Sequence, residues 1–216
     1  HDTPILHALG VRNSSVFFSN CTIWVEGITD RRYLRKYLRF YFCHKYGLPV
    51  DDTSKLPFKE DLHYSFVEYG GANITHWSFL DGTPDPIVVD RLCGRLLLIA
   101  DKDNAPSKDA RHQKLKDRLK ERFIVHARRE IENLLPATAL RSTIAVYEKA
   151  SDHIPAIDYA SYADVGLGKY IDDLLGAGKK REGSYAEESG TLTDKIKFCD
   201  RALEQLSKWE DLSEDA

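Results

Sequence analysis

The sequence predicts an α/β protein with a mainly parallel central sheet flanked by helices and an added helical C-terminal portion. Strand and helix patterns alternate through residue 135, and the pattern is helical from 137 onward. The run at 95–100 is apolar on both faces, as in a parallel sheet covered by helices. The 216 residues, 42% hydrophobic and 30% charged, suffice for a sizeable core in a globular chain.

The first half of the predicted sheet lies before residue 70. A β-branched and aromatic run at 21–26 predicts a strand that ends at Gly27. A helix is expected to open at Asp30, because apolar side chains then recur at three- and four-residue spacing. A second strand is expected at 65–69, closed by two glycines that begin with Gly70.

The second half of the predicted sheet lies between residues 95 and 135. The strand at 95–100 is followed by a strongly charged helix over about 108–122 and a short strand at 123–126. Another helix is expected to begin at Arg129 and to be interrupted by Pro136. This order of elements is typical of a parallel α/β core.

The remainder of the chain is expected to be helical. Glycines and charged residues over 176–190 predict a mobile loop. Thr191, with Asp194 three residues later, resembles a capping box that would start a final helix.

Composition restricts the compartment and the class of protein. No run approaches the roughly 20 apolar residues of a membrane span, so no membrane association is expected. The start at His1 carries no signal-peptide pattern, which favours a cytoplasmic location. The four cysteines form no CxxC pair, which disfavours a zinc site and a disulfide framework. Methionine is absent, and we therefore expect a fragment whose upstream domain is missing.

Basic residues cluster locally although the formal net charge is −3. Local basic faces can bind phosphate backbones even on an acidic chain, because the field follows local clustering. Charge alone favours the alternative that these are solvated helix faces. The candidate nucleic-acid contacts are Arg31, Arg32, Arg35, Lys114 and Lys116.

Acidic residues follow three of the predicted strands. In an α/β sheet, functional groups gather at the carboxyl ends of the strands. Converging carboxylates repel one another, and a divalent cation such as Mg²⁺ or Mn²⁺ would neutralise them. The acids in chain order are Glu26, Asp30, Asp101, Asp103, Glu130 and Glu132.

Other interpretations of these acids are weaker. Each alone is a common strand terminus. A calcium loop starting at Asp101 fails, because Pro106 and His112 stand where a glycine and a glutamate are needed. A phosphatase-type nucleophile at Asp101 remains open, although the residues that follow are a poor continuation.

Four segments resemble a known fold and one family within it. VEGITD at 25–30 and IADKD at 99–103 resemble the signature motifs of the Toprim fold, found in topoisomerases, primases and nucleases of the OLD (overcoming lysogenization defect) family. YGGAN at 69–73 and REIENLL at 129–135 resemble the OLD nucleases in particular. The resemblance covers about 20–135 as a Toprim core. It implies that 1–20 leads in from an ABC-type ATPase domain and leaves 136–216 as a helical portion.

The resemblance implies two-metal phosphodiester hydrolysis with Mg²⁺ or Mn²⁺. A late-helix lysine completes such sites, and Lys195 is preferred to Lys197; Glu132 is preferred to Glu130 because the IEN triplet is more family-like. Because metals would activate water, His76, His112 and His126 are interpreted as surface or packing residues. The implied metal ligands are Glu26, Asp30, Asp101, Asp103 and Glu132, and the implied catalytic residues are Glu26, Asp101, Asp103, Glu132 and Lys195.

The function expected from the resemblance is a metal-dependent DNA endonuclease, with ATP acting only through the missing upstream domain. RNA or tRNA cleavage stays open, because the same chemistry serves both polymers. A topoisomerase or primase is disfavoured by the short chain and the missing zinc motif. A non-catalytic module that binds Mg²⁺-nucleotide or mediates dimerisation is disfavoured, since an unused acidic set would only add repulsion. A homodimer is compatible with each of these.

Overall fold

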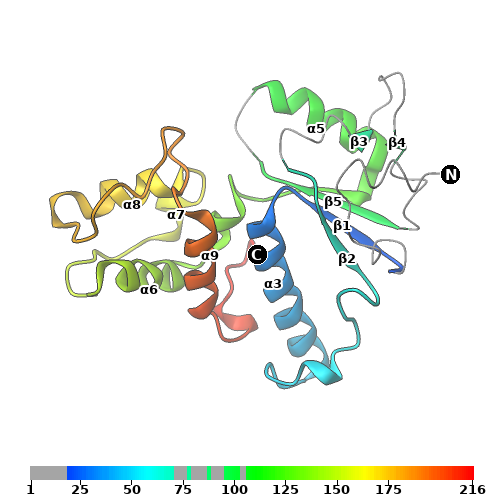
Figure 1. Ribbon diagram of the computed structural model, residues 1–216, viewed down its shortest axis with the longest axis horizontal. Coiled ribbons are helices and arrows are strands. Elements are labelled where there is room, and N and C mark those ends of the chain that lie inside the picture. The colour runs from blue at the N-terminus through cyan, green and yellow to red at the C-terminus, as the bar shows by residue number, and fades with distance from the viewer. Residues whose placement is uncertain (1–18, 71–76, 79–86, 89–94, 103–105) are drawn as a thin grey trace. The chain divides into compact units, whose positions relative to one another are not determined.

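The computed structural model describes residues 19–70, 77–78, 87–88, 95–102 and 106–216 (Figure 1). The chain divides into two compact units whose segments alternate along the sequence. The sheet unit comprises residues 1–27, 57–100 and 109–124. The helical unit comprises residues 28–56, 101–108 and 125–216.

The sheet has four strands in the spatial order β2-β1-β5-β6, and the fold is α/β with a parallel central sheet, as the sequence predicts. β1 pairs in parallel with both neighbours, so that Thr22 lies opposite Ser65 on one side and opposite Leu96 on the other. The strands are β1 (Thr22–Val25), β2 (Ser65–Glu68), β5 (Leu96–Ala100) and β6 (Phe123–Val125). Each lies within two residues of its predicted bounds.

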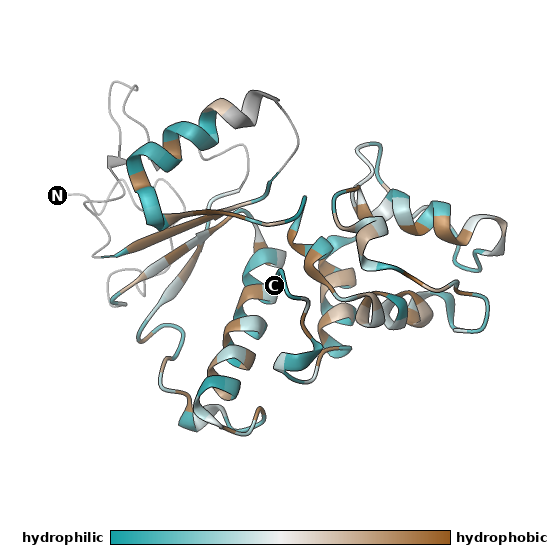
Figure 2. Ribbon diagram, turned by 180° about the vertical axis from the view of Figure 1, so that it is seen from behind, coloured by the Kyte–Doolittle hydropathy of each residue, from teal (hydrophilic) through white to brown (hydrophobic). Residues whose placement is uncertain are grey.

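The central strands are hydrophobic along their length (Figure 2). Every residue of β1 is buried, and Val25 and Leu98 are fully inaccessible to solvent. This is expected of parallel strands that have no solvated face. α5 (Pro106–Leu119) and η3 (Lys120–Arg122) connect β5 to β6. α5 opens with a proline. Proline has no backbone N–H, and this costs nothing here because an N–H in the first turn of a helix has no helical partner.

Two very short strands were not expected from the sequence. β3 (Trp77–Ser78) and β4 (Ile87–Val88) pair in parallel as a separate two-stranded sheet. Two residues are too few to produce an alternation pattern, so local sequence contains no signal for them.

The helical unit begins with α3 (Ile28–Tyr46), which starts two residues before the predicted Asp30. Asp30 therefore lies in the first helical turn, where the helix dipole favours a carboxylate. Tyr33, Tyr37 and Phe40 form its buried face at three- and four-residue spacing. α3 packs beside α9, more than 150 residues later in the chain (Figure 1).

A 3-10 turn replaces the helix that was expected from Arg129. The turn, η4, holds only Ile131–Leu134, and Pro136 then serves as the N-cap of the next helix. The other elements of the helical unit are η1 (Thr53–Lys55), α6 (Ala137–Glu148), α7 (Tyr159–Tyr162), α8 (Leu167–Leu175), η5 (Gly176–Gly178), α9 (Lys195–Glu204) and η6 (Trp209–Asp211).

The capping box predicted at Thr191 is wrong. α9 begins at Lys195, and its N-cap is Asp194, whose Oδ1 accepts the Lys197 N–H at 3.2 Å. Thr191 precedes the first turn and lies against α8 instead. A Cβ at Gly168 would come within 2.5 Å of the Thr191 carbonyl oxygen, so glycine permits this close approach.

The predicted loop at 176–190 forms hydrogen bonds with the helices around it. Two of its backbone N–H groups, from Tyr185 and Ala186, donate to the Asp172 carboxylate of α8 at 2.8 and 3.1 Å. Glu148 at the end of α6 accepts the N–H groups of Lys180 and Arg181. In the described part of the chain, no helix is both long enough and apolar enough to span a bilayer.

Candidate metal centre

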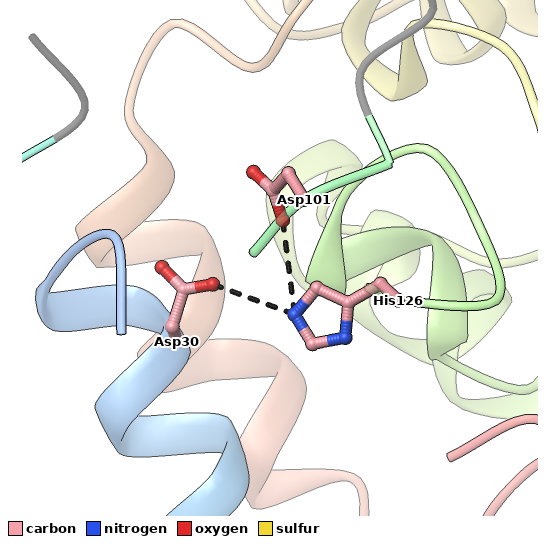
Figure 3. A group of neighbouring side chains, drawn as sticks. All are labelled: Asp30, Asp101 and His126. Atoms are coloured by element: carbon pink, nitrogen blue, oxygen red, sulfur yellow. Dashed lines mark ion pairs between the residues drawn. The ribbon is translucent and has the colours of Figure 1, made fainter. Parts of the chain in front are cut away.

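Three side chains that are distant in sequence meet within the helical unit (Figure 3). Asp30 belongs to the first turn of α3, Asp101 directly follows β5, and His126 directly follows β6. Nε2 of His126 lies 3.7 Å from an oxygen of Asp30 and 3.7 Å from an oxygen of Asp101. One potential ligand atom from each residue lies within 4.8 Å of the other two.

These separations suit the ligands of one metal ion better than hydrogen bonds. An N–H···O bond spans about 2.7–3.2 Å, which is shorter than the observed 3.7 Å. Metal–ligand bonds of about 2.0–2.3 Å place neighbouring ligand atoms roughly 3–4 Å apart. The two carboxylates and the imidazole could therefore bind a divalent ion with little rearrangement.

The centre is shielded from water. Asp30 and His126 are buried, with 6% and 8% of their surfaces exposed, and Asp101 is largely covered. Nε2 of His126 is buried and has no hydrogen-bond partner among the described residues. A buried polar atom normally has a partner, so this nitrogen has a binding position that no described residue fills.

Two further acids lie in the same region, on the turn η4. Glu132 is 1% exposed, and its Oε1 forms no hydrogen bond within the described chain. Burial raises the pKa of Glu132 to about 7; Lys195 opposes the rise, whereas Asp30 and Glu130 reinforce it. Desolvation and neighbouring carboxylates thus both disfavour the ionised form.

Lys195, the first residue of α9, supplies positive charge to this acidic region. Its Nζ lies 3.5 Å from an oxygen of Glu130. Burial lowers the pKa of Lys195, but Glu132, Glu130 and Asp101 outweigh burial and leave the pKa raised. The lysine therefore remains protonated. The side chain of Lys197 is exposed, so Lys195 is the lysine of the two that faces the acids.

Asn133 fixes the turn that presents these glutamates. Its Oδ1 accepts the Glu130 N–H at 3.1 Å, and its Nδ2 donates to the carbonyls of Tyr162 at 2.6 Å and Val165 at 3.0 Å. These bonds anchor η4 to the α7 region of the same unit. The IEN triplet is therefore a structural device that holds Glu132 in the buried position.

The structure brings together part of the predicted site. Asp30, Asp101, Glu132 and Lys195 lie in one electrostatically coupled region of the helical unit. Asp103 lies outside the described residues. Glu26 follows β1 in the sheet unit, where its carbonyl accepts the Gly70 N–H at 2.9 Å, so its role as a ligand stays a prediction.

The predicted nucleic-acid contacts fall into two groups. On α3, Arg32 forms an ion pair with Asp200 of α9, Arg31 is half-buried and Arg35 is exposed. On the part of α5 that belongs to the sheet unit, Lys114 and Lys116 are exposed. The exposed side chains could contact phosphate as they are. Arg32 would first have to leave its ion pair with Asp200.

His126 is the residue of the centre that sequence reasoning did not select. It was interpreted as a surface or packing residue, but it is buried and its ring faces two carboxylates (Figure 3). The signal available in the sequence was its position, since it directly follows a strand as Asp101 does. His112 does pack, with its ring centroid 5.6 Å from that of Phe123. His76 lies outside the described residues.

Comparison with protein-family models, curated proteins and solved structures finds no match for this chain. The class of site therefore follows from its geometry alone. It is a buried centre of carboxylates with one imidazole and one lysine, whose donor atoms suit a hard or borderline divalent cation.

Proposed function

We propose that this chain is the Toprim nuclease portion of an OLD-family ATP-dependent endonuclease, which hydrolyses DNA phosphodiester bonds with Mg²⁺ or Mn²⁺. The observation that carries the proposal is the meeting of Asp30 and Asp101, with Glu132 electrostatically coupled to Asp30. The Toprim and OLD motifs selected these acids from distant segments. In the helical unit, Asp30 and Asp101 offer ligand atoms close together, Glu132 is electrostatically coupled to Asp30, and Lys195 is coupled to Glu132 and Asp101.

The residues of the centre suit such a reaction. Asp30, Asp101 and Glu132 offer oxygen ligands. Burial and the neighbouring carboxylates raise the pKa of Glu132 despite the opposing charge of Lys195. Lys195 can donate hydrogen bonds to a phosphate oxygen and offset the charge that grows there. A divalent cation, when bound, supplies an activated water and stabilisation of the leaving oxygen.

The remainder of the proposal extends beyond the coupled region. Glu26 and Asp103 would complete the ligand set for two ions, and Arg35 with Lys114 and Lys116 would contact the phosphate backbone. The partners would be DNA and an upstream ATPase domain, with a homodimer as a further option, in the cytoplasm. The catalytic residues would be Glu26, Asp101, Asp103, Glu132 and Lys195.

The test is cleavage of supercoiled plasmid by the purified chain in Mg²⁺, Mn²⁺ or EDTA, with labelled tRNA in parallel. Asp30→Asn and Asp101→Asn should each reduce nicking at least about 100-fold, because each removes a charged ligand. Asp173→Asn is the matched control, since this aspartate is exposed on α8 and forms an ion pair with Lys169 at 3.1 Å. It should cleave like the parent.

The outcomes separate the alternatives. Cleavage in EDTA, or full activity of Asp101→Asn, would exclude the metal mechanism. Cleavage of tRNA but not of plasmid would assign the site to RNA. Tight metal binding without cleavage of either polymer would support the non-catalytic module.

A further inference from the structure

We propose that His126 is a nitrogen ligand of the Asp30–Asp101 centre, and that it makes the centre prefer Mn²⁺ to Mg²⁺. The inference deepens the proposed function and rests on it for the biological use of the ion. No segment that resembles a Toprim or OLD motif contains this histidine, so the assignment comes from its place in the structure.

The first observation is the direction of the ring. Nε2 of His126 points between the carboxylates of Asp30 and Asp101 and is equidistant from both, at 3.7 Å (Figure 3). A histidine that only anchored one aspartate would approach it to hydrogen-bond distance, about 2.7–3.2 Å. Equal and longer separations leave room for an ion between the three donor atoms.

The second observation is burial without a partner. His126 is 8% exposed, and its Nε2 has no hydrogen bond within the described residues. An imidazole nitrogen in such a position offers a lone pair when the ring is neutral. The candidate site therefore does not rest on Asp30 and Asp101 alone, because the buried Nε2 of His126 faces both carboxylates.

The donor set determines the metal preference. Mg²⁺ demands oxygen ligands and retains its water, whereas imidazole suits first-row transition metals. Two carboxylates and one imidazole thus favour Mn²⁺, which accepts both oxygen and nitrogen. With His126 changed to asparagine, the centre should lose this preference and treat the two ions more alike.

The direct test is pulsed electron paramagnetic resonance of Mn²⁺ bound to the full chain without nucleic acid. The parent should show ¹⁴N modulation from a coordinated imidazole, and His126→Asn should lose it. His44→Asn is the control, because this histidine is exposed on α3 and pairs with Glu210 at 3.2 Å. Competition with Mg²⁺ should show a Mn²⁺ preference at least about 10-fold larger in the parent than in His126→Asn.

Circular dichroism would show whether His126→Asn fails to fold. In that case two other measurements still test whether His126 binds the metal. The parent labelled with ¹⁵N-histidine should convert the ¹⁴N modulation into ¹⁵N modulation, and Asp101→Asn should weaken Mn²⁺ binding. Absence of nitrogen modulation from Mn²⁺ bound to the parent would overturn the inference even if plasmid is cleaved. Nitrogen modulation without cleavage would support the inference and overturn the proposed function.

Discussion

Two buried glutamates of the helical unit have opposite environments. Glu148 at the end of α6 and Glu132 on η4 are 2% and 1% exposed. Glu148 accepts the Tyr185 hydroxyl at 2.6 Å on one oxygen and the Arg181 N–H at 3.3 Å, together with the Lys180 N–H, on the other. Oε1 of Glu132 has no such partner in the described chain.

The pKa values of the two carboxyls move in opposite directions. Burial raises the pKa of Glu148, but hydrogen bonds from Tyr185, Lys180 and Arg181 outweigh burial and leave it below its usual value of 4.5. Burial raises the pKa of Glu132 to about 7. A buried acid whose partners are all within the protein stabilises the fold, whereas one with unused acceptor capacity marks a candidate functional site.

The largest effect is expected from Glu148→Gln. The amide of glutamine keeps one oxygen but turns its NH₂ group toward donors that need an acceptor. Either the Tyr185 hydroxyl or the part-buried N–H groups of Lys180 and Arg181 would then lose their partner. We expect the free energy of unfolding to fall by about 4 kcal/mol. Urea unfolding at pH 7 measures it, and a loss below about 1 kcal/mol would show that the loop does not depend on this acid.

Glu132→Gln, measured in EDTA, should raise the free energy of unfolding at high pH, whereas Glu148→Gln lowers it. Because folding raises the pKa from 4.5 to about 7, the folded state binds the extra proton between these values. The stability that this carboxyl contributes is complete below pH 4.5 and is lost as pH rises through 7, by at most about 3 kcal/mol.

Urea unfolding between pH 5 and pH 8 checks this expectation. The parent in EDTA should lose stability across the range, and Glu132→Gln should be more stable than the parent at pH 8 and vary less with pH. For Glu148 the sign is reversed: its contribution is present above 4.5 and disappears as pH falls through its lowered pKa. If the free energy of unfolding depended on pH in the same way for Glu132→Gln and Glu148→Gln, the proposed difference between the two carboxyls would be wrong.

The sequence predicted the sheet well because the signal for strands is local. All four strands are short and rich in β-branched, aromatic or aliphatic residues, and β1 and β5 are followed directly by Glu26 and Asp101. The position of Asp101 at the end of a strand followed from the same local pattern, whereas the choice of Lys195 came from the family resemblance alone. α9 could be expected as a helix, but its packing against α3 depends on side chains about 165 residues apart, for which a local pattern contains no information.

The features that sequence reasoning missed depend on tertiary contacts. η4 is a 3-10 turn rather than a helix because Asn133 supplies side-chain hydrogen bonds in place of helical ones. The sequence around Glu148 gives no sign of the loop groups that donate to it, which follow 32–37 residues later. A single histidine after a strand is ambiguous until the fold places His126 between two carboxylates.

A smaller loss than that of Glu148→Gln is expected from Asp172→Asn, which tests whether burial of the acid sets the size of the loss. Asp172 accepts the Tyr185 and Ala186 N–H groups and the Lys179 ammonium at 2.7 Å, but its side chain is 21% exposed. Water can replace part of what the carboxylate provides, so we expect a loss of about 1 kcal/mol by urea unfolding. Asp173→Asn, one position later and 65% exposed, should change stability less. If Asp172→Asn destabilised the chain as much as Glu148→Gln, burial of the acid would not matter. The number of hydrogen bonds that the acid accepts would then decide how strongly it stabilises the loop.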